Sequence, residues 1–578
     1  MEKVNLKKYI LRMSLIFILL ISAFVCIYTV RNYKSNNTMT QNNQFKREGN
    51  ISNNNINNML NGQNSPQDIP SSNGNQTNSS GNTTDSNGTV QSNQNGDTVP
   101  RNWNRQSNQN GGMAPPNGNK QPGQSGNRQP GQNGNMQRGN TNTKYVPALT
   151  IYSGIFLILC VGTYYLFRRK NIKINLADEK ILIFTLLAAA LLLRIAAATL
   201  MDGQYDINLF ENWASTAANG LSQFYSSARS ADYPPLYIYI LALIGKIASI
   251  STFNSYFVLM LKIPSIIADI VTSYFIYKIG KKHLSSEISI FIATFYIFNP
   301  AIFIDSTFWG QVDSIFTLFI VIAVFLLSKK KIAASSAVFV ATVLMKPQGI
   351  IFLPILFFEL VRERKVKNFI YAAVSAMVTA LIIIIPFSLN QQSPLWIFKL
   401  YSNTISEYPY ASVNGFNFFS LIGANYKNNT DTLFVFNYHT WGMIFIVVTT
   451  LISWFVYIKS NNRNFVSAIA LLQIAGVFTF SVGMHERYLF PAVALSILAF
   501  IYLKDRRFFI LSIGFSITNY INISSVLFNL NSSTFNILLM ITSFLNVLLV
   551  IYLVKVLFES AIKKSFTEII KEESNQSL

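Results

Sequence analysis

From residue 147 onward, the sequence is a succession of apolar runs that are long enough, or nearly long enough, to cross a lipid bilayer. A membrane-spanning helix needs about 20 mostly apolar residues. Residues 9–30 form an earlier run, which follows a basic start and is not followed by the small-residue cleavage site of a signal peptide. We therefore predict a first span there. The other predicted spans are 147–167, 180–201, 256–279, 286–304, 309–328, 332–346, 348–361, 367–387, 438–458, 465–482, 488–503, 507–528 and 534–555.

Short clusters of Lys and Arg lie between these runs, at 168–170, 281–282, 329–331, 362–367, 459–463, 504–507 and 563–564. Such clusters are typical of cytoplasmic loops, and alternating crossings place all of them on one face. The segment 235–250 is also apolar, but counting it as a span would place Lys281 and Lys282 outside. We expect it to lie along the outer interface or to re-enter the membrane. A misplaced boundary among the short runs at 332–361 is the alternative.

The composition agrees with a membrane protein. Only 12% of the residues are charged, against about 25% in soluble domains. A net charge of +21 would suggest nucleic acid binding in a soluble protein, but here the basic residues lie in the loops between spans, and no nucleic acid partner is expected. Residues 31–143 are rich in Asn, Gln, Gly and Ser and cannot bury enough apolar area to fold. They are predicted to be a disordered, low-complexity tether outside the membrane.

The predicted fold is an all-α polytopic membrane protein with about 13–14 transmembrane helices. Its expected parts are an N-terminal transmembrane helix (1–30), the disordered linker (31–143), an additional transmembrane helix (144–170) and a membrane domain (171–578).

With this topology, unusual polar residues gather at the outer ends of the spans. Lys346 lies between two short apolar runs, where a lone cation costs about 2.5–3.5 kcal/mol unless it faces an anion or a polar cavity. His485, Glu486 and Arg487 are consecutive, and a purely structural Glu486–Arg487 ion pair is the alternative to a functional role. A shared polar site explains these residues best. The stretches concerned are MDGQYDINLFENWA, ADYPPLY, DSTFWGQVD, LMKPQG, ASVNGFNFF and VGMHERY.

Such a site combines carboxylates that can accept a proton from a hydroxyl with Lys and Arg side chains that bind phosphate. Aromatic residues around it offer faces for sugar rings or a lipid chain. The chain contains no Walker A loop, HExxH, CxxC or DxD motif. Because an outer site has no supply of nucleotide sugars, a lipid-linked donor fits better. The pattern favours transfer from a phosphorylated lipid to a hydroxyl acceptor, which could be a lipid, a wall polymer or a protein.

At these residues the chain resembles the GT-C superfamily of integral-membrane glycosyltransferases. It is most similar to bacterial relatives of the PIG-V-type glycosylphosphatidylinositol mannosyltransferase. The matching stretches are YDINLFENWA, DYPPLYIY, FWGQVDS, MKPQGIIFLP, NGFNFF and MHERYLFP. The resemblance implies that residues 171–578 form a GT-C-like domain. It also implies an inverting mannosyltransferase of the cytoplasmic membrane that uses a polyprenyl-phosphate sugar on the extracytoplasmic side.

The resemblance also implies roles for individual residues. Asp206 best matches the catalytic carboxylate of the first outer loop, and Asp202 is its nearest rival. Lys346, Arg487 and His485 are expected to stabilise the donor phosphate. No cofactor is firmly implied; the metal ligands are unknown, and a divalent cation, Mg²⁺ or Mn²⁺, is left open. The expected sugar and acceptor pocket comprises Asp232, Tyr233, Trp309, Gln311, Asp313, Gln348, Asn414, Asn417, Glu486 and Tyr488.

Three other functions are weighed against this one. A flippase or transporter for lipid-linked sugars predicts polar residues along a path through the membrane and often an inverted repeat, whereas here the polar residues gather on one face. A ligase or polymerase that uses a lipid diphosphate fits the same residues. A non-catalytic envelope protein acting through its tether leaves the HERY and MKPQ segments unexplained.

Overall fold

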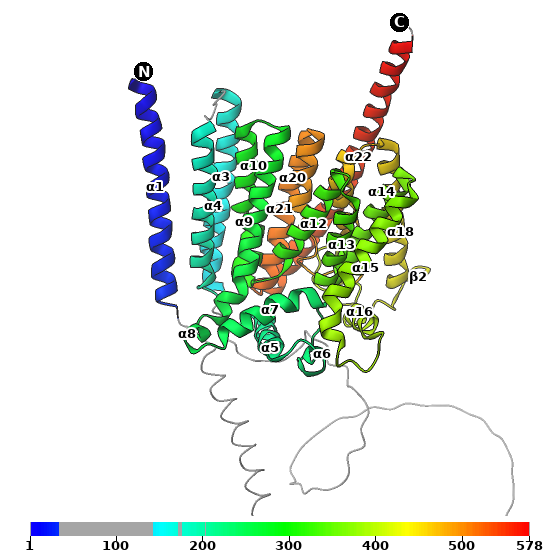
Figure 1. Ribbon diagram of the computed structural model, residues 1–578. Coiled ribbons are helices and arrows are strands. Elements are labelled where there is room, and N and C mark those ends of the chain that lie inside the picture. The colour runs from blue at the N-terminus through cyan, green and yellow to red at the C-terminus, as the bar shows by residue number, and fades with distance from the viewer. Residues whose placement is uncertain (1, 34–142, 171–175, 203, 577–578) are drawn as a thin grey trace, which may run out of the picture. The chain divides into compact units, whose positions relative to one another are not determined.

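The computed structural model describes residues 2–33, 143–170, 176–202 and 204–576 (Figure 1). Most of the predicted tether, residues 34–142, lies outside the described residues. The described chain is almost entirely helical, and its strands are one short antiparallel pair, β1 (Thr432–Leu433) with β2 (Phe436–Asn437). This confirms the predicted all-α class.

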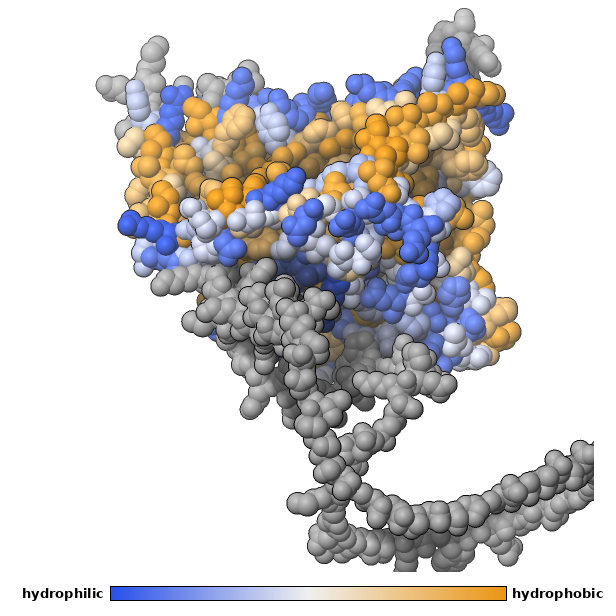
Figure 2. All heavy atoms as spheres, turned by 60° about the horizontal axis from the view of Figure 1, so that its bottom comes forward, coloured by the Kyte–Doolittle hydropathy of each residue, from blue (hydrophilic) through white to orange (hydrophobic). Residues whose placement is uncertain are grey.

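Among the described residues, nine helical segments are long and apolar enough to cross a membrane, and each coincides with a predicted span. Figure 2 shows an apolar band bounded by polar surface on both sides, as a multi-pass membrane protein requires. These segments lie in α1 (Glu2–Arg31), α3 (Val146–Lys170), α4 (Leu176–Ala198), α9 (Phe257–His283), α15 (Val366–Ser388), α18 (Tyr438–Ser460), η4 with α19 (Arg463–Phe465, Val466–Phe480), α21 (Arg506–Leu527) and α22 (Ser532–Gln576).

The predicted span 286–304 is a broken helix. α10 (Ser286–Ile297) is followed by α11 (Pro300–Phe303) and the π-helical turn η2 (Ile304–Trp309), and the two parts meet at 43°. The break follows from the local sequence. The Asn299 side chain accepts the Ala301 N–H and starts a new helix, and Pro300 follows at a position where its missing N–H costs nothing.

Four other predicted spans are helical but are not among the candidate spans, and two of them, predicted at 309–328 and 488–503, begin three or four residues later than expected. They are α12 (Asp313–Ser328), α13 (Ile332–Met345), η3 with α14 (Pro347–Phe352, Leu353–Glu363) and α20 (Pro491–Leu503). α12 has 16 residues and is therefore about 24 Å long, less than the roughly 30 Å of a hydrocarbon core. Its last residue is followed by the exposed Lys329–Lys331. A helix of this length that begins at one boundary of the core ends short of the other.

The segment 235–250 forms α7 (Pro235–Ala248), which has 14 residues and is not among the candidate spans. It packs against α5 (Tyr205–Asn219), and a Cβ at Gly245 would collide with the backbone carbonyl of Ala214. Close approach of the two helices therefore requires glycine there. α5, α6 (Phe224–Ser227), α7, α8 (Ser251–Asn254) and α16 (Trp396–Ser406) lie together at the end of the bundle opposite to both chain termini (Figure 1).

Candidate functional site

Asp206 is the centre of the polar site. It lies in the first turn of α5, and its side chain is 29% exposed. A single oxygen, Oδ2, accepts hydrogen bonds from Trp309 Nε1 at 3.2 Å, Gln311 Nε2 at 2.5 Å and Arg487 Nη1 at 3.1 Å. Oδ1 receives none of these bonds. The three donors therefore fix the carboxylate in one orientation, and its second oxygen takes no part in these bonds.

The turn between Trp309 and Gln311 explains how two neighbouring segments of chain reach the same oxygen. Gly310 has φ +77°, in the left-handed region that favours glycine. A Cβ there would also lie 2.7 Å from Ile207 Cδ1 and 2.9 Å from Lys262 Cγ. The Gln311 N–H donates to the Asp305 carbonyl at 3.1 Å, and the Gln311 carbonyl accepts from Ser265 Oγ at 2.6 Å. The first bond ties the turn back to η2, and the second holds it against α9.

Arg487 links three carboxylates. Its guanidinium lies 3.1 Å from Asp206, 3.0 Å from Glu486 and 3.7 Å from Asp313, and it stacks over the Trp309 ring at 4.6 Å. Burial alone would lower the pKa of Arg487, but the surrounding carboxylates raise it well above its ordinary value. Arg487 therefore carries a permanent positive charge beside Asp206. The Glu486–Arg487 ion pair weighed from the sequence is present, within this larger network.

Lys346 is not a lone cation. Its Nζ lies 2.6 Å from Asp313 Oδ1, both side chains are 2% exposed, and the ammonium lies 5.2 Å from the centre of the Tyr488 ring. The pair forms because α12 begins at Asp313 and α13 ends at Met345, so that both helix ends meet. An anion supplied by the protein thus offsets the cost of burying this cation in the bundle.

His485 lies between two tyrosine rings, 4.7 Å from Tyr408 and 5.0 Å from Tyr488. Burial, with Arg487 and Lys346 nearby, lowers the pKa of His485 to about 3. It is therefore a neutral imidazole. Its ring lies beside the network, and its expected role toward the donor phosphate stays a prediction.

Asp232 and Tyr233 precede α7. Burial, together with the nearby carboxylates of Glu407 and Asp206, raises the pKa of Asp232 to about 7. The Asp232 carbonyl accepts from Thr404 Oγ1 at 2.9 Å, which ties this loop to α16. Tyr233 packs its ring against Phe210 and Trp213 and so belongs to the aromatic packing of α5 on α7.

The Asn414 and Asn417 segment holds the backbone of the HERY turn. Val413 and Asn414 form β-bridges with His485, and the Val413 N–H donates to Met484 O at 3.0 Å. Asn417 caps α17 (Phe418–Leu421) and donates to the carbonyls of Phe478 and Ser481, both at 3.3 Å. Both residues therefore lie next to the site, with their described bonds directed to the scaffold.

Two other predicted residues stand apart from Asp206. Asp202 accepts a hydrogen bond from the Tyr33 hydroxyl at 3.0 Å. Burial raises the pKa of Asp202, while Lys262 and the Tyr33 bond oppose that shift. Asp202 thus fastens the end of α1 to the loop before α5. Gln348 lies in η3, and its Oε1 is buried without a hydrogen-bond partner among the described residues.

Sequence reasoning missed a buried ion pair behind the site. Arg194 of α4 lies 2.9 Å from Asp269 of α9, with side chains 2% and 0% exposed. Arg194 also donates to Ser306 Oγ at 2.7 Å and to the Ile297 carbonyl at 2.6 Å. It therefore joins both sides of the break between α10 and η2 and supports the turn that carries Trp309. The available signal was a charged residue well inside each of two predicted spans, Arg194 in 180–201 and Asp269 in 256–279.

The described residues contain no group of three or more His, Cys, Asp or Glu side chains that could hold a metal ion.

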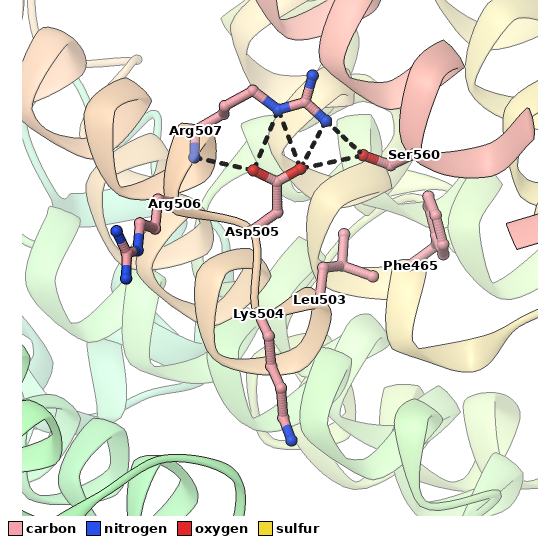
Figure 3. A pocket seen from close by; sticks show the side chains of 7 residues that line it. All are labelled: Phe465, Leu503, Lys504, Asp505, Arg506, Arg507 and Ser560. Carbon is pink, nitrogen blue, oxygen red and sulfur yellow. Dashed lines mark hydrogen bonds and ion pairs between the residues drawn. The ribbon is translucent and has the colours of Figure 1, made fainter. Parts of the chain in front are cut away.

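Two cavities lie away from Asp206. One, of about 510 Å³, is at the opposite end of α20 and is lined by Phe465, Leu503, Lys504, Asp505, Arg506, Arg507 and Ser560. There Arg507 folds onto Asp505 and reaches Ser560 (Figure 3). The second, of about 500 Å³, is an apolar groove between η3–α14 and α18, lined by Ile350, Leu353, Pro354, Phe357, Phe358, Thr450, Leu451 and Trp454.

Comparison with known proteins supports the class of enzyme. Residues 232–389 match the family model of dolichyl-phosphate-mannose-protein mannosyltransferases. The match includes Trp309, Gln311, Asp313 and Lys346, and it ends before Arg487. No curated protein matches the chain. The match supports a multi-pass membrane glycosyltransferase of the GT-C superfamily, as the sequence predicted. It does not confirm the expected similarity to PIG-V-type mannosyltransferases.

Proposed function

We propose that the protein transfers a sugar, in particular mannose, from a polyprenyl-phosphate sugar to a hydroxyl acceptor, with inversion at the anomeric carbon. The observation that carries the proposal is Asp206, whose Oδ2 is fixed by three donors while Oδ1 is free of them. A carboxylate held in this way is suited to accept the proton of an attacking hydroxyl.

In the proposed reaction, the acceptor oxygen attacks the anomeric carbon as Asp206 takes its proton. The bond between that carbon and the phosphate oxygen breaks, and the phosphate leaves with the electron pair. Because attack and departure occur on opposite faces in a single displacement, the product is inverted. Arg487 and Lys346 are the cations within the network that can stabilise the developing phosphate charge.

The side of the membrane follows from the basic clusters. α12 runs from Asp313 in the site to Lys329–Lys331, and α20 runs from the HERY turn to Lys504–Arg507. Since clusters of this kind mark the cytoplasmic side, the proposed active site faces the outside of the cytoplasmic membrane. A lipid-linked donor is available there.

The apolar groove supports a donor with a long lipid chain. Ile350, its first lining residue, lies four positions after Lys346 in the chain, so one short stretch of backbone joins the groove to the proposed phosphate site. We expect Trp454→Ala to raise KM for a long-chain polyprenyl-phosphate mannose about 5- to 10-fold, because about 1–1.4 kcal/mol of apolar contact is lost. KM for a short-chain donor should change little.

Phe455→Ala is the matched control for the groove, since Phe455 is on the same helix, is 55% exposed and does not line the groove. Equal effects of Trp454→Ala on long-chain and short-chain donors would exclude this groove as the lipid site.

Lys346→Met should raise KM for the donor at least about 10-fold through loss of a charge that binds phosphate. The single variant also leaves Asp313 as a buried, unpaired carboxylate. The double variant Lys346→Met/Asp313→Asn removes that complication. A persistently high KM in the double variant supports phosphate binding by Lys346, whereas recovery of the wild-type KM assigns Lys346 a structural role only.

The function as a whole is tested by the transfer of radiolabelled sugar from synthetic polyprenyl-phosphate mannose and polyprenyl-phosphate glucose. Purified full-length protein is supplied with a crude cell-envelope acceptor. Incorporation from the mannose donor supports the proposal, and incorporation from glucose alone corrects the sugar. Folded protein that uses neither donor but transfers from a lipid diphosphate overturns it.

A further inference from the structure

Asp305 is a buried acid that the reaction proposed above does not use. It lies in η2, four residues before Trp309, and is 0% exposed. Neither of its carboxyl oxygens has a hydrogen-bond partner among the described residues. An ionised carboxylate in such a position would be an uncompensated buried charge, which costs several kcal/mol.

The cations around Asp305 are already paired. The charged groups that act on it are Asp313, Arg487, Lys346 and Asp269, with Asp313 the strongest. Lys346 binds Asp313, and Arg487 binds Asp206 and Glu486 and lies 3.7 Å from Asp313. Asp269 is already paired with Arg194. Both cations that act on Asp305, Lys346 and Arg487, therefore already have carboxylate partners.

The charges of the site lead to the same conclusion. Asp206, Asp313 and Glu486 provide three negative charges, against the two positive charges of Lys346 and Arg487. An ionised Asp305 would make the site more negative still, and an anionic phosphate would then have to enter it. A proton on Asp305 avoids both costs.

One atom is suited to receive that proton in a hydrogen bond. Asp313 binds Lys346 through Oδ1, while its buried Oδ2 lies 3.7 Å from Arg487 Nε, beyond hydrogen-bond distance, and has no hydrogen-bond partner among the described residues. Oδ2 is an acceptor on the group that acts most strongly on Asp305, and a protonated carboxyl is a donor.

We propose that Asp305 is a positioning residue that acts as a neutral carboxylic acid, donates its O–H to Oδ2 of Asp313 and thereby keeps the site receptive to the phosphate of the donor. The protonated state stands on the burial and pairing described above. The effect on the donor rests on the proposed function.

Infrared spectroscopy of the purified full-length protein tests the protonated state without any substrate. The difference spectrum between wild type and Asp305→Asn at neutral pH should show loss of a carbonyl band from a protonated carboxyl. In the Asp313→Asn variant this band should remain but shift, because its acceptor has changed. A difference spectrum with carboxylate bands only would overturn the inference.

Equilibrium binding of polyprenyl-phosphate mannose tests the effect on the donor. Asparagine keeps a neutral donor at the same place, so Asp305→Asn should bind the donor within about twofold of wild type. Asp305→Ala, which leaves Asp313 without that bond, should bind it at least about 10-fold more weakly, as expected for the loss of one hydrogen bond to a charged group. Equal weakening in both variants contradicts the proposed role. If the glycosyltransferase assignment is wrong, the protein will transfer no sugar, but the infrared spectrum will still show the protonated carboxyl of Asp305. The two failures can therefore be told apart.

Discussion

Asp206→Asn is expected to reduce sugar transfer at least about 100-fold, the lower end for loss of a general base. The amide has nearly the same shape but cannot take the acceptor proton, and its orientation depends on the same neighbours, Trp309, Gln311 and Arg487. The measurement is initial-rate transfer from the lipid-linked donor, with folding checked by size-exclusion chromatography and thermal unfolding.

Asp202→Asn is the matched control for that experiment. Asp202 lies in the loop that leads into α5, and its described side-chain bond is to Tyr33 at the end of α1. We expect this variant to keep transfer within about fivefold of wild type, because Asp202 has no described bond to Asp206 or Arg487. Near-normal transfer by Asp206→Asn, or a larger loss in Asp202→Asn, would refute the assignment of Asp206.

Arg194→Met should destabilise the protein by about 3–5 kcal/mol, the range found when one partner of a buried ion pair is removed. The change leaves Asp269 buried without its guanidinium and breaks the bonds to Ser306 and to the Ile297 carbonyl. Unfolding in detergent, followed by circular dichroism against denaturant or temperature, measures the effect.

Two control variants identify the cause of that loss. The double variant Arg194→Met/Asp269→Leu removes both charges and should recover much of the stability, since paired apolar residues often replace a buried ion pair without loss. Arg12→Met breaks a comparable pair with Asp178 at 2.9 Å, but Arg12 is 39% exposed, so the cost should be about 0–1 kcal/mol. Equal effects of Arg194→Met and Arg12→Met would argue against burial as the cause.

The sequence predicted the class of fold and the grouping of the site well, for physical reasons. Apolar runs of spanning length have few alternatives to helices in a membrane, and basic clusters fix which ends lie together. That was enough to bring Asp206, Gln311 and Arg487 to one end of the bundle. Periodicity and charge could not give the lengths of α12 and α20. A short helix that is buried among other helices has the same apolar composition as a short membrane span.

Details of the site depended on packing that the sequence pattern does not encode. The π-helical turn at η2 and the left-handed Gly310 decide that Trp309 and Gln311 reach the same oxygen. The lowered pKa of His485 results from burial and from two neighbouring cations, Arg487 and Lys346. Lys346 comes from a distant part of the chain. The role of Asp202 depended on Tyr33, which is separated from it by the whole tether.

The 16-residue length of α12 has a consequence for what the enzyme can modify. The helix is about 24 Å long, against a roughly 30 Å hydrocarbon core, so in the proposed topology, with Lys329–Lys331 at the cytoplasmic boundary, Asp313 would lie several ångströms below the outer one. In the proposed reaction, the acceptor hydroxyl has to descend to that depth to meet the donor. A hydroxyl on the broad face of a folded domain is held above the membrane, whereas one on a slender chain, such as a glycan end or an unfolded peptide, can be threaded down. Under the proposed function, the length of one helix would thus select acceptors by their width.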